Sequence, residues 1–249
     1  MYTAKVRCIV WALVLFSTIS VDAQSYIWGI KGGLTVGTQR WTSFSARSGL
    51  FRYHGDLFIE NWSEEDKFAL GAQIGYHPRG SGLQFFGYSN GTSGSVRSFT
   101  QRYIFNNAVL SVYAKQKFTL NDKFKGYYAI GLRGEYTFSS NLPSVNDLAK
   151  GSVYNYTPIK ENIRPWNFGP LVVAGLQFNY SELVGGFLEF NVSPDLSRQY
   201  YQVPINNVIL FDPFTGNAVP GSIPEQVIRN ISLEITFGFR FLRKIEYID

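Results

Sequence analysis

Residues 227–241 have the sequence VIRNISLEITFGFRF, in which apolar and polar side chains alternate. Every odd-numbered position is apolar except Arg229, while the even-numbered positions include Asn230, Ser232 and Glu234. Successive side chains of an extended strand point to opposite faces of a sheet. The segment therefore predicts a long β-strand with one apolar face and one polar face.

The same period of two recurs along most of the chain. Segments of roughly ten residues or more, separated by turn-forming residues, are typical of membrane β-barrels. After residue 23 no run of roughly 18 apolar residues occurs, so no membrane-spanning helix is predicted there. The further alternating segments are residues 26–39, 51–61, 68–77, 103–118, 126–138, 166–180 and 184–195.

Together the segments predict an all-β fold, a closed antiparallel up-and-down transmembrane β-barrel with eight strands. Ten strands are the alternative, because residues 202–222 (QVPINNVILFDPFTGNAVPGS) could contain another hairpin. Eight is preferred, since that stretch shows no clean alternation.

The first 23 residues predict a cleaved signal peptide. Lys5 and Arg7 form a basic start, residues 8–19 form an apolar segment, and residues 21–23 (VDA) offer a small-residue cleavage site. The apolar segment is shorter than the ~20 residues that a membrane-spanning helix needs. We therefore expect residues 24–249 to form the mature barrel domain, exported to the outer membrane of a Gram-negative bacterium.

Composition excludes several classes of protein. The only cysteine is Cys8, inside the predicted signal peptide, so a disulfide-stapled domain and a thiolate zinc site are excluded. The net charge of +5 is mild and no block of like charges occurs, so no nucleic-acid partner is predicted. Charged residues make up only 16%, against about 25% in soluble domains.

Two features favour a membrane barrel over a soluble one. The polar faces carry much Gly, Ala and Ser and little charge, which suits a narrow lumen better than a water-facing surface. The ten steps from Phe168 to Phe178, at ~3.3 Å each and tilted near 40°, span roughly 25 Å, the height of a lipid-facing band. Outer-membrane lipid is therefore an expected partner. The predicted aromatic girdle is Tyr26, Trp28, Tyr76, Tyr128, Tyr136, Phe138, Trp166, Phe168, Phe178, Tyr180, Phe237, Phe239 and Phe241.

Two residues fit the predicted strands poorly. Pro170 removes a ladder hydrogen bond, so we expect a bulge at Gly169-Pro170. Arg229 falls on the lipid-facing side, where it is tolerated only near the membrane interface.

The links between segments alternate in length. Residues 63–66, 119–124 and 181–183 are short links, which bacterial barrels place on the periplasmic side. Asn90-Gly91 is a hairpin-tip signal, so the second hairpin is expected to project beyond the membrane. The long links are residues 40–50, 78–102, 139–165 and 196–226.

Charged side chains on the polar faces have to pair, because unpaired charge inside a narrow lumen is costly. An eight-stranded barrel leaves no open channel, so these residues predict a structural plug; a selectivity filter or narrow pore is the alternative. The predicted network is Lys31, Arg52, Asp56, Glu60, Lys115, Arg133, Glu135, Glu189, Glu234 and Arg240.

The sequence predicts no catalytic, metal or cofactor site. His54 and His77 are the only histidines, and no further metal ligands follow at a suitable spacing. A lipid hydrolase built on His77, a loop serine and Glu60 or Glu135 is the enzymatic alternative, but no nucleophile motif supports it. We instead expect a scaffold whose long loops contact proteins or glycans. Three segments rich in aromatic residues and Asn suit such contacts: residues 153–156, 199–202 and 209–214.

The opening YIWGIKGGLTVG (26–37), the segments GLRGEYTF (131–138) and GLQFNY (175–180), and the closing ISLEITFGFRF (231–241) resemble the PorT-like outer-membrane β-barrel family of Gram-negative, Bacteroidetes-type bacteria. The resemblance covers essentially all of residues 24–249. It implies a small outer-membrane barrel, with some relatives serving secretion or cell-surface functions, and it supplies no catalytic residues.

Overall fold

The structure is a computed structural model that describes residues 25–42, 47–62, 67–88, 96–121, 123–144, 158–211 and 217–244. The predicted signal peptide, the Asn90-Gly91 tip and residues 153–156 lie outside the described residues, as does part of 209–214.

Eight long antiparallel strands close into a ring. Each pairs with its neighbour in sequence from β1 to β7, and β11 closes the ring by pairing with both β7 and β1. The closing ladder runs from Tyr26 opposite Arg243 to Trp41 opposite Ile228. The predicted eight-stranded closed barrel is thereby confirmed. The ring strands are β1 (Tyr26–Trp41), β2 (Arg47–Asn61), β3 (Phe68–Tyr88), β4 (Val96–Thr119), β5 (Phe124–Ser140), β6 (Trp166–Asn179), β7 (Val184–Pro194) and β11 (Gln226–Arg243).

Four short elements lie outside the ring. The 3₁₀ turn η1 (Lys160–Asn162) precedes β6, and β8 (Tyr200–Gln202) pairs with the first residues of β11. Strands β9 (Ile205–Phe211) and β10 (Ala218–Ile223) form a separate two-stranded sheet. The β9–β10 hairpin is the additional hairpin that the ten-strand alternative required. It exists, but its strands do not join the barrel.

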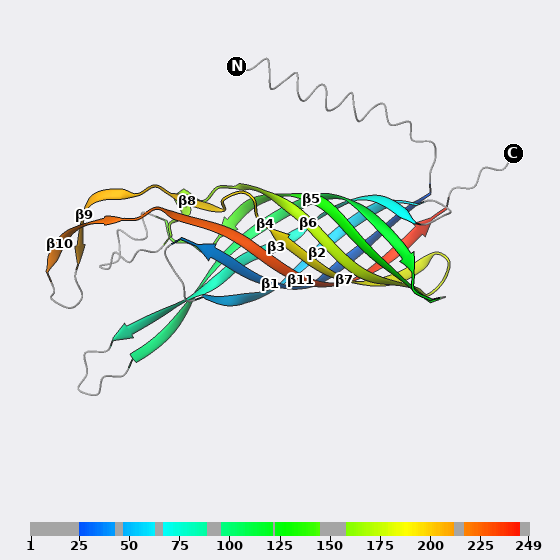
Figure 1. Cartoon of the computed structure of the whole chain (residues 1–249), viewed down its shortest axis with the longest axis horizontal. Coiled ribbons are helices and arrows are strands. Elements are labelled where there is room, and N and C mark those ends of the chain that lie inside the picture. The colour runs from blue at the N-terminus through cyan, green and yellow to red at the C-terminus, as the bar shows by residue number, and fades with distance from the viewer. Residues whose placement is uncertain are drawn as a thin grey trace, which may run out of the picture.

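The two ends of the barrel differ. The beginning of β1, the end of β11 and residues 181–183 lie at one end, which we call the terminal end. The β9–β10 hairpin and the far part of the β3–β4 hairpin extend from the opposite end, the loop end (Figure 1).

The side chains of the ring are arranged inside out relative to a soluble protein. Along β11, Ser232, Glu234 and Thr236 are buried in the lumen while Ile235 and Phe237 are exposed on the outside. Exposed apolar side chains cover the outer wall of every ring strand, and buried acids and bases lie within. Such a wall is stable only against lipid, so the ring strands span a membrane. Among the described residues no helix is long and apolar enough to cross one.

The strands run further than the sequence predicted. Residues 78–102 were predicted as a long link with a projecting hairpin, and the alternation was followed only in residues 68–77 and 103–118; β3 and β4 remain paired from Phe68 opposite Gln116 to Tyr88 opposite Val96. Proline within a strand removes a ladder hydrogen bond and is tolerated where no neighbouring strand needs its N–H. Here Pro78 lies opposite the stretch in which β2 and β3 are not paired, between Gly49 and Gly55 of β2. The expected projection of this hairpin is confirmed.

The bulge expected at Gly169-Pro170 is absent. The β5–β6 register passes through Pro170, opposite Leu132, without a shift. The β6–β7 ladder begins only at Val172. Pro170 therefore has no partner in β7, and no ladder hydrogen bond to β7 is lost because proline lacks an N–H. Arg229 lies at the loop end, exposed and directly opposite Arg40.

Candidate functional site

The lumen contains a chain of ion pairs, and its first part lies toward the terminal end. Lys31 Nζ donates to Glu189 Oε2 at 2.7 Å, and Tyr127 Oη donates to the other oxygen of Glu189 at 2.9 Å. Lys115 pairs with Glu60, which also accepts from Tyr113 Oη at 2.9 Å. Each carboxylate is thus held by an ammonium and a phenol from other strands.

A second part of the network centres on two arginines. Arg79 pairs with Glu135 at 2.8 Å and with Glu234 at 3.2 Å. Arg133 pairs with Glu135 through Nε at 2.6 Å and with Asp195. All five side chains are almost fully buried. Carboxylates from β5, β11 and the segment after β7 therefore hold the two guanidinium groups in place.

His77 links the second part to Asp56, which lies opposite Lys31 in the β1–β2 ladder. Its Nε2 lies 2.7 Å from Asp56 Oδ1 and its Nδ1 lies 2.9 Å from Glu234 Oε1. A carboxylate only accepts hydrogen bonds, so both contacts require a protonated ring nitrogen and the geometry fits an imidazolium. His54 stacks on His77 at 5.0 Å, and threonines flank it: Thr35 Oγ1 and Thr236 Oγ1, each at 2.9 Å.

The buried charges balance only with His77 included. Within the described part of the chain, the buried acids outnumber the buried lysines and arginines by one, and an imidazolium at His77 makes the two sets equal. Balance matters because an uncompensated charge in a desolvated lumen is costly. The acids are Asp56, Glu60, Glu135, Glu189, Asp195 and Glu234, and the bases are Lys31, Arg79, Lys115, Lys117 and Arg133.

The structure brings most of the predicted network together. Two predicted members lie elsewhere. Arg52 is half-buried and makes no ion pair with a described residue, and Arg240 is half-buried at the terminal end, where it donates to Asn179 Oδ1 at 2.6 Å. The buried, ion-paired members are Lys31, Asp56, Glu60, Lys115, Arg133, Glu135, Glu189 and Glu234.

Sequence reasoning missed three members of the network. Arg79 and His77 share the inward face of β3, and Asp195 follows the inward Ser193 at the end of β7. Continuing the period of two beyond Pro78 would have placed Arg79 on the lumen face. His77 and Asp195 already fell on the polar faces of segments 68–77 and 184–195 but were not counted in the network.

The predicted girdle residues all belong to the outer wall. At the terminal end Trp28 contacts Phe241 with ring centroids 4.8 Å apart. At the loop end Tyr136 lies 4.9 Å from Trp166, and Tyr76 lies 6.1 Å from Phe138. The remaining members are half-exposed or exposed on the same wall: Tyr26, Tyr128, Phe168, Phe178, Tyr180, Phe237 and Phe239.

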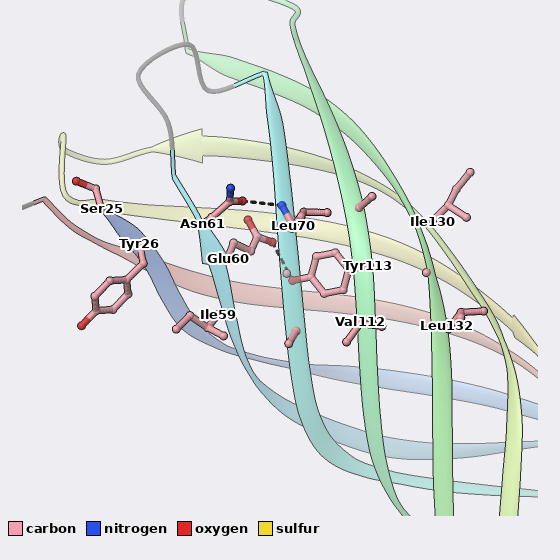
Figure 2. A pocket seen from close by; sticks show the side chains of 14 residues that line it. Ser25, Tyr26, Ile59, Glu60, Asn61, Leu70, Val112, Tyr113, Ile130 and Leu132 are labelled. Carbon is pink, nitrogen blue, oxygen red and sulfur yellow. Dashed lines mark hydrogen bonds between the residues drawn. The ribbon is translucent and has the colours of Figure 1, made fainter. Parts of the chain in front are cut away.

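An apolar groove of about 710 Å³ crosses the outer wall near the terminal end (Figure 2). It forms because the outward positions of β3 and β4 include the small residues Ala72 and Ala114 between larger apolar side chains. Behind it, Glu60 accepts the hydrogen bond of Tyr113 shown in Figure 2. In a membrane this groove faces lipid chains, and its walls are Ile59, Leu70, Val112, Ile130 and Leu132.

Neither histidine is placed for hydrolysis. His77 is 2% exposed and both its ring nitrogens are engaged by acids, so the predicted alternative of a His77–serine pair is not formed among the described residues. His54 bonds to threonines deep in the lumen. The described residues contain no group of three acids, histidines or cysteines able to hold a metal ion.

No family model matches the chain, and no curated protein matches it, so membership of the PorT-like family stays a prediction. Several solved structures share part of its shape. The outer membrane protein OprG from Pseudomonas aeruginosa is 11% identical over 88% of this chain and 97% of that chain, with a TM-score of 0.45. The attachment invasion locus protein Ail of Yersinia pestis, in complex with sucrose octasulfate, is 12% identical over 88% and 99%, with a TM-score of 0.37. The outer membrane protease OmpT from Escherichia coli is 9% identical over 90% and 98%, with a TM-score of 0.38.

Proposed function

We propose that this protein is a small outer-membrane barrel of a Gram-negative bacterium, exported by a cleaved signal peptide, that acts as a non-enzymatic scaffold. In this proposal its lumen is plugged and its loop end contacts a protein or glycan partner, in keeping with the secretion or cell-surface functions that the resemblance to the PorT-like family implies. The observation that carries this proposal is the contrast between a filled, ion-paired lumen and two hairpins that extend beyond the barrel (Figure 1).

The filled lumen argues for a plug. Toward the loop end, the charge network is followed by a buried apolar cluster that includes Trp41, Tyr103, Phe105 and Tyr200. A second buried cluster includes Phe58, Tyr113 and Phe187. An eight-stranded barrel is just wide enough for side chains to fill it. No continuous aqueous path is expected through such packing.

The β9–β10 hairpin supplies the contact surface. An isolated two-stranded hairpin is marginally stable in water. This one exposes Ile205, Val219 and Ile209, the last with 78% of its surface accessible, so a partner that covers it would bury apolar side chains. Of the segments expected to make contacts, residues 199–202 are a poor surface because Gln199 and Tyr200 are buried. Binding residues commonly lie on loops that a rigid scaffold positions.

Planar-bilayer recording tests the plug. We expect the refolded protein to give no steady conductance, because the lumen side chains pair with one another and exclude a water column. Steady, large current steps from the folded form, with heat-modifiable migration on gels as the check of folding, would contradict the plug and favour the narrow-pore alternative.

Site-specific photo-cross-linking tests the contact surface. A photoreactive amino acid at Ile209 should give a discrete adduct in native membranes, since this side chain is exposed on the projecting hairpin. The matched control is Leu183, which is also exposed but lies in the short link at the terminal end. Adducts from Leu183 but none from Ile209 or Val219 would refute the assignment of the loop end.

A further inference from the structure

A gap opens in the barrel wall between β2 and β3. The two strands pair up to Gly49 opposite Ser81 and resume at Gly55 opposite Tyr76, so the residues between them form no ladder. A cleft of about 470 Å³ lies beside this gap. Four strands contribute to its lining, which includes Arg52, Tyr53, Tyr76, Asn106, Ser140 and Asn141.

Two hydrogen-bonding atoms of this lining are buried without a partner among the described residues. They are Nε of Arg52 and Oγ of Ser140. Buried polar groups are normally hydrogen-bonded, so each unpaired one requires an explanation. Arg52 lies on β2 opposite Thr35, near the lumen network, yet no carboxylate of the described residues pairs with it.

The polar side chains of Tyr76, Asn106 and Asn141 in the cleft are already engaged. Asn106 accepts from Tyr76 Oη at 2.7 Å and donates to Ser139 Oγ at 2.8 Å. Asn141 accepts from the N–H of Ile104 and donates to the carbonyl of Arg102, both at 2.7 Å. The guanidinium of Arg52 and the hydroxyl of Ser140 have no partner among the described residues, and together they suit a negatively charged ligand that is rich in hydrogen-bond acceptors. No acidic residue within the described ranges lines the cleft to compete for Arg52.

The position of the cleft identifies the source of that ligand. Tyr53 and Tyr76 are exposed on the outer wall at 78% and 45%, and Tyr76 contacts Phe138 in the aromatic girdle of the loop end. Tyrosine and tryptophan girdles lie at the level of lipid headgroups. Below the cleft the wall carries apolar side chains such as Leu57 and Ile74, where lipid chains would lie.

We propose that this cleft binds the phosphate group of a membrane lipid, with Arg52 as the main contact and Ser140 as a second donor. A planar guanidinium matches phosphate oxygens in a bidentate arrangement, and charge-assisted bonds of this kind are the strong ones. The open ladder between β2 and β3 gives the guanidinium a route to the outer wall that a closed ladder would deny it.

Binding is measured by native mass spectrometry of the full-length protein refolded in a non-ionic detergent. The probe is phosphatidic acid, with phosphatidylcholine and inorganic phosphate as separate titrations. Arg52→Gln should weaken phosphatidic acid binding at least tenfold, about 1.4 kcal/mol. Ser140→Ala should weaken it about threefold, in line with the loss of one neutral hydrogen bond. Arg229→Gln removes the same charge from the lipid-facing wall away from the cleft and should change binding less than about twofold, since surface charges contribute little.

Three results would overturn the proposal. An equal loss of phosphatidic acid binding in Arg52→Gln and Arg229→Gln would mean that the lipid is attracted to a basic surface in general and not to the cleft. Phosphatidylcholine binding as tight as phosphatidic acid would mean that the headgroup charge is not recognised. Inorganic phosphate binding as tight as the lipid would mean an anion site without a lipid.

Arg52→Gln is replaced if it does not fold, as judged by heat-modifiable migration. Arg52→Lys and Ser140→Ala then test the site: both should fold and bind phosphatidic acid more weakly than the natural protein, and unchanged binding in both would refute the site.

Discussion

Glu234→Gln is expected to lower the free energy of unfolding by about 3 to 5 kcal/mol, the cost of breaking a buried ion pair by removing one partner. Glu234 lies 2.9 Å from His77 Nδ1 and 3.2 Å from Arg79, and all three side chains are buried. Glutamine keeps the shape of the side chain but removes the charge, so a buried imidazolium and guanidinium lose a counter-ion. Urea unfolding in detergent micelles, followed by gel mobility and tryptophan fluorescence, measures the change.

Ser232→Ala is the matched control for this variant. Ser232 precedes Glu234 on the same lumen face of β11, is equally buried, and its Oγ has no hydrogen-bond partner among the described residues. Removing the Ser232 hydroxyl should change the free energy of unfolding by less than about 1 kcal/mol. Adding His77→Gln to Glu234→Gln should recover part of the loss, because the two side chains are directly coupled. Equal and small effects of Glu234→Gln and Ser232→Ala would show that the ion pairs contribute little to stability.

Gly33→Val should prevent the ring from closing, with a cost of about 3 kcal/mol or more. Gly33 lies opposite Thr236 in the closing β1–β11 ladder. A Cβ at this position would overlap the carbonyl oxygen of Ile235 and lie 2.8 Å from Cα of Thr236. Both are backbone atoms, so room can be made only by moving β11 away from β1. We expect loss of the fast-migrating folded form on unheated gels and a lower urea midpoint.

Gly55→Val supplies the control for Gly33→Val, because it is the same substitution in a neighbouring strand. A Cβ at Gly55 would meet nothing nearer than the carbonyl oxygen of Lys31, at 3.8 Å. Valine also suits a strand better than glycine, so the folded form should be retained and its stability should stay within about 1 kcal/mol. Retention of the folded form by both variants would show that the β1–β11 closure tolerates a side chain at Gly33.

The barrel itself could be predicted from the sequence because its two faces differ so sharply. Along β11 the alternation of Glu234 and Thr236 with Ile235 and Phe237 specifies which side chains meet lipid. The aromatic residues at strand ends then indicate the height of the membrane-facing band. These are properties of single strands, and a single sequence carries them.

Relations between strands could not be predicted in the same way. Pro170 suggested a bulge and residues 78–102 were predicted as a long link, yet Pro78 and Pro170 both lie within strands, at levels where one neighbouring strand is not paired. Arg52 was expected in the lumen network, since its place in the alternation is inward. It lies instead beside the β2–β3 gap. The alternation within a strand determines which face of the sheet each side chain is on. It does not indicate where the hydrogen bonding to the neighbouring strand is interrupted.

Closure by β1 and β11 has a practical consequence for labelling the protein in living cells. Tyr26 and Arg243 are cross-strand partners at the terminal end, whereas β9 and β10 extend from the opposite end (Figure 1). An epitope fused after residue 249 and the same epitope inserted between β9 and β10 would thus report on opposite sides of the membrane. Antibody staining of intact cells should detect only the inserted epitope, and permeabilised cells should reveal both.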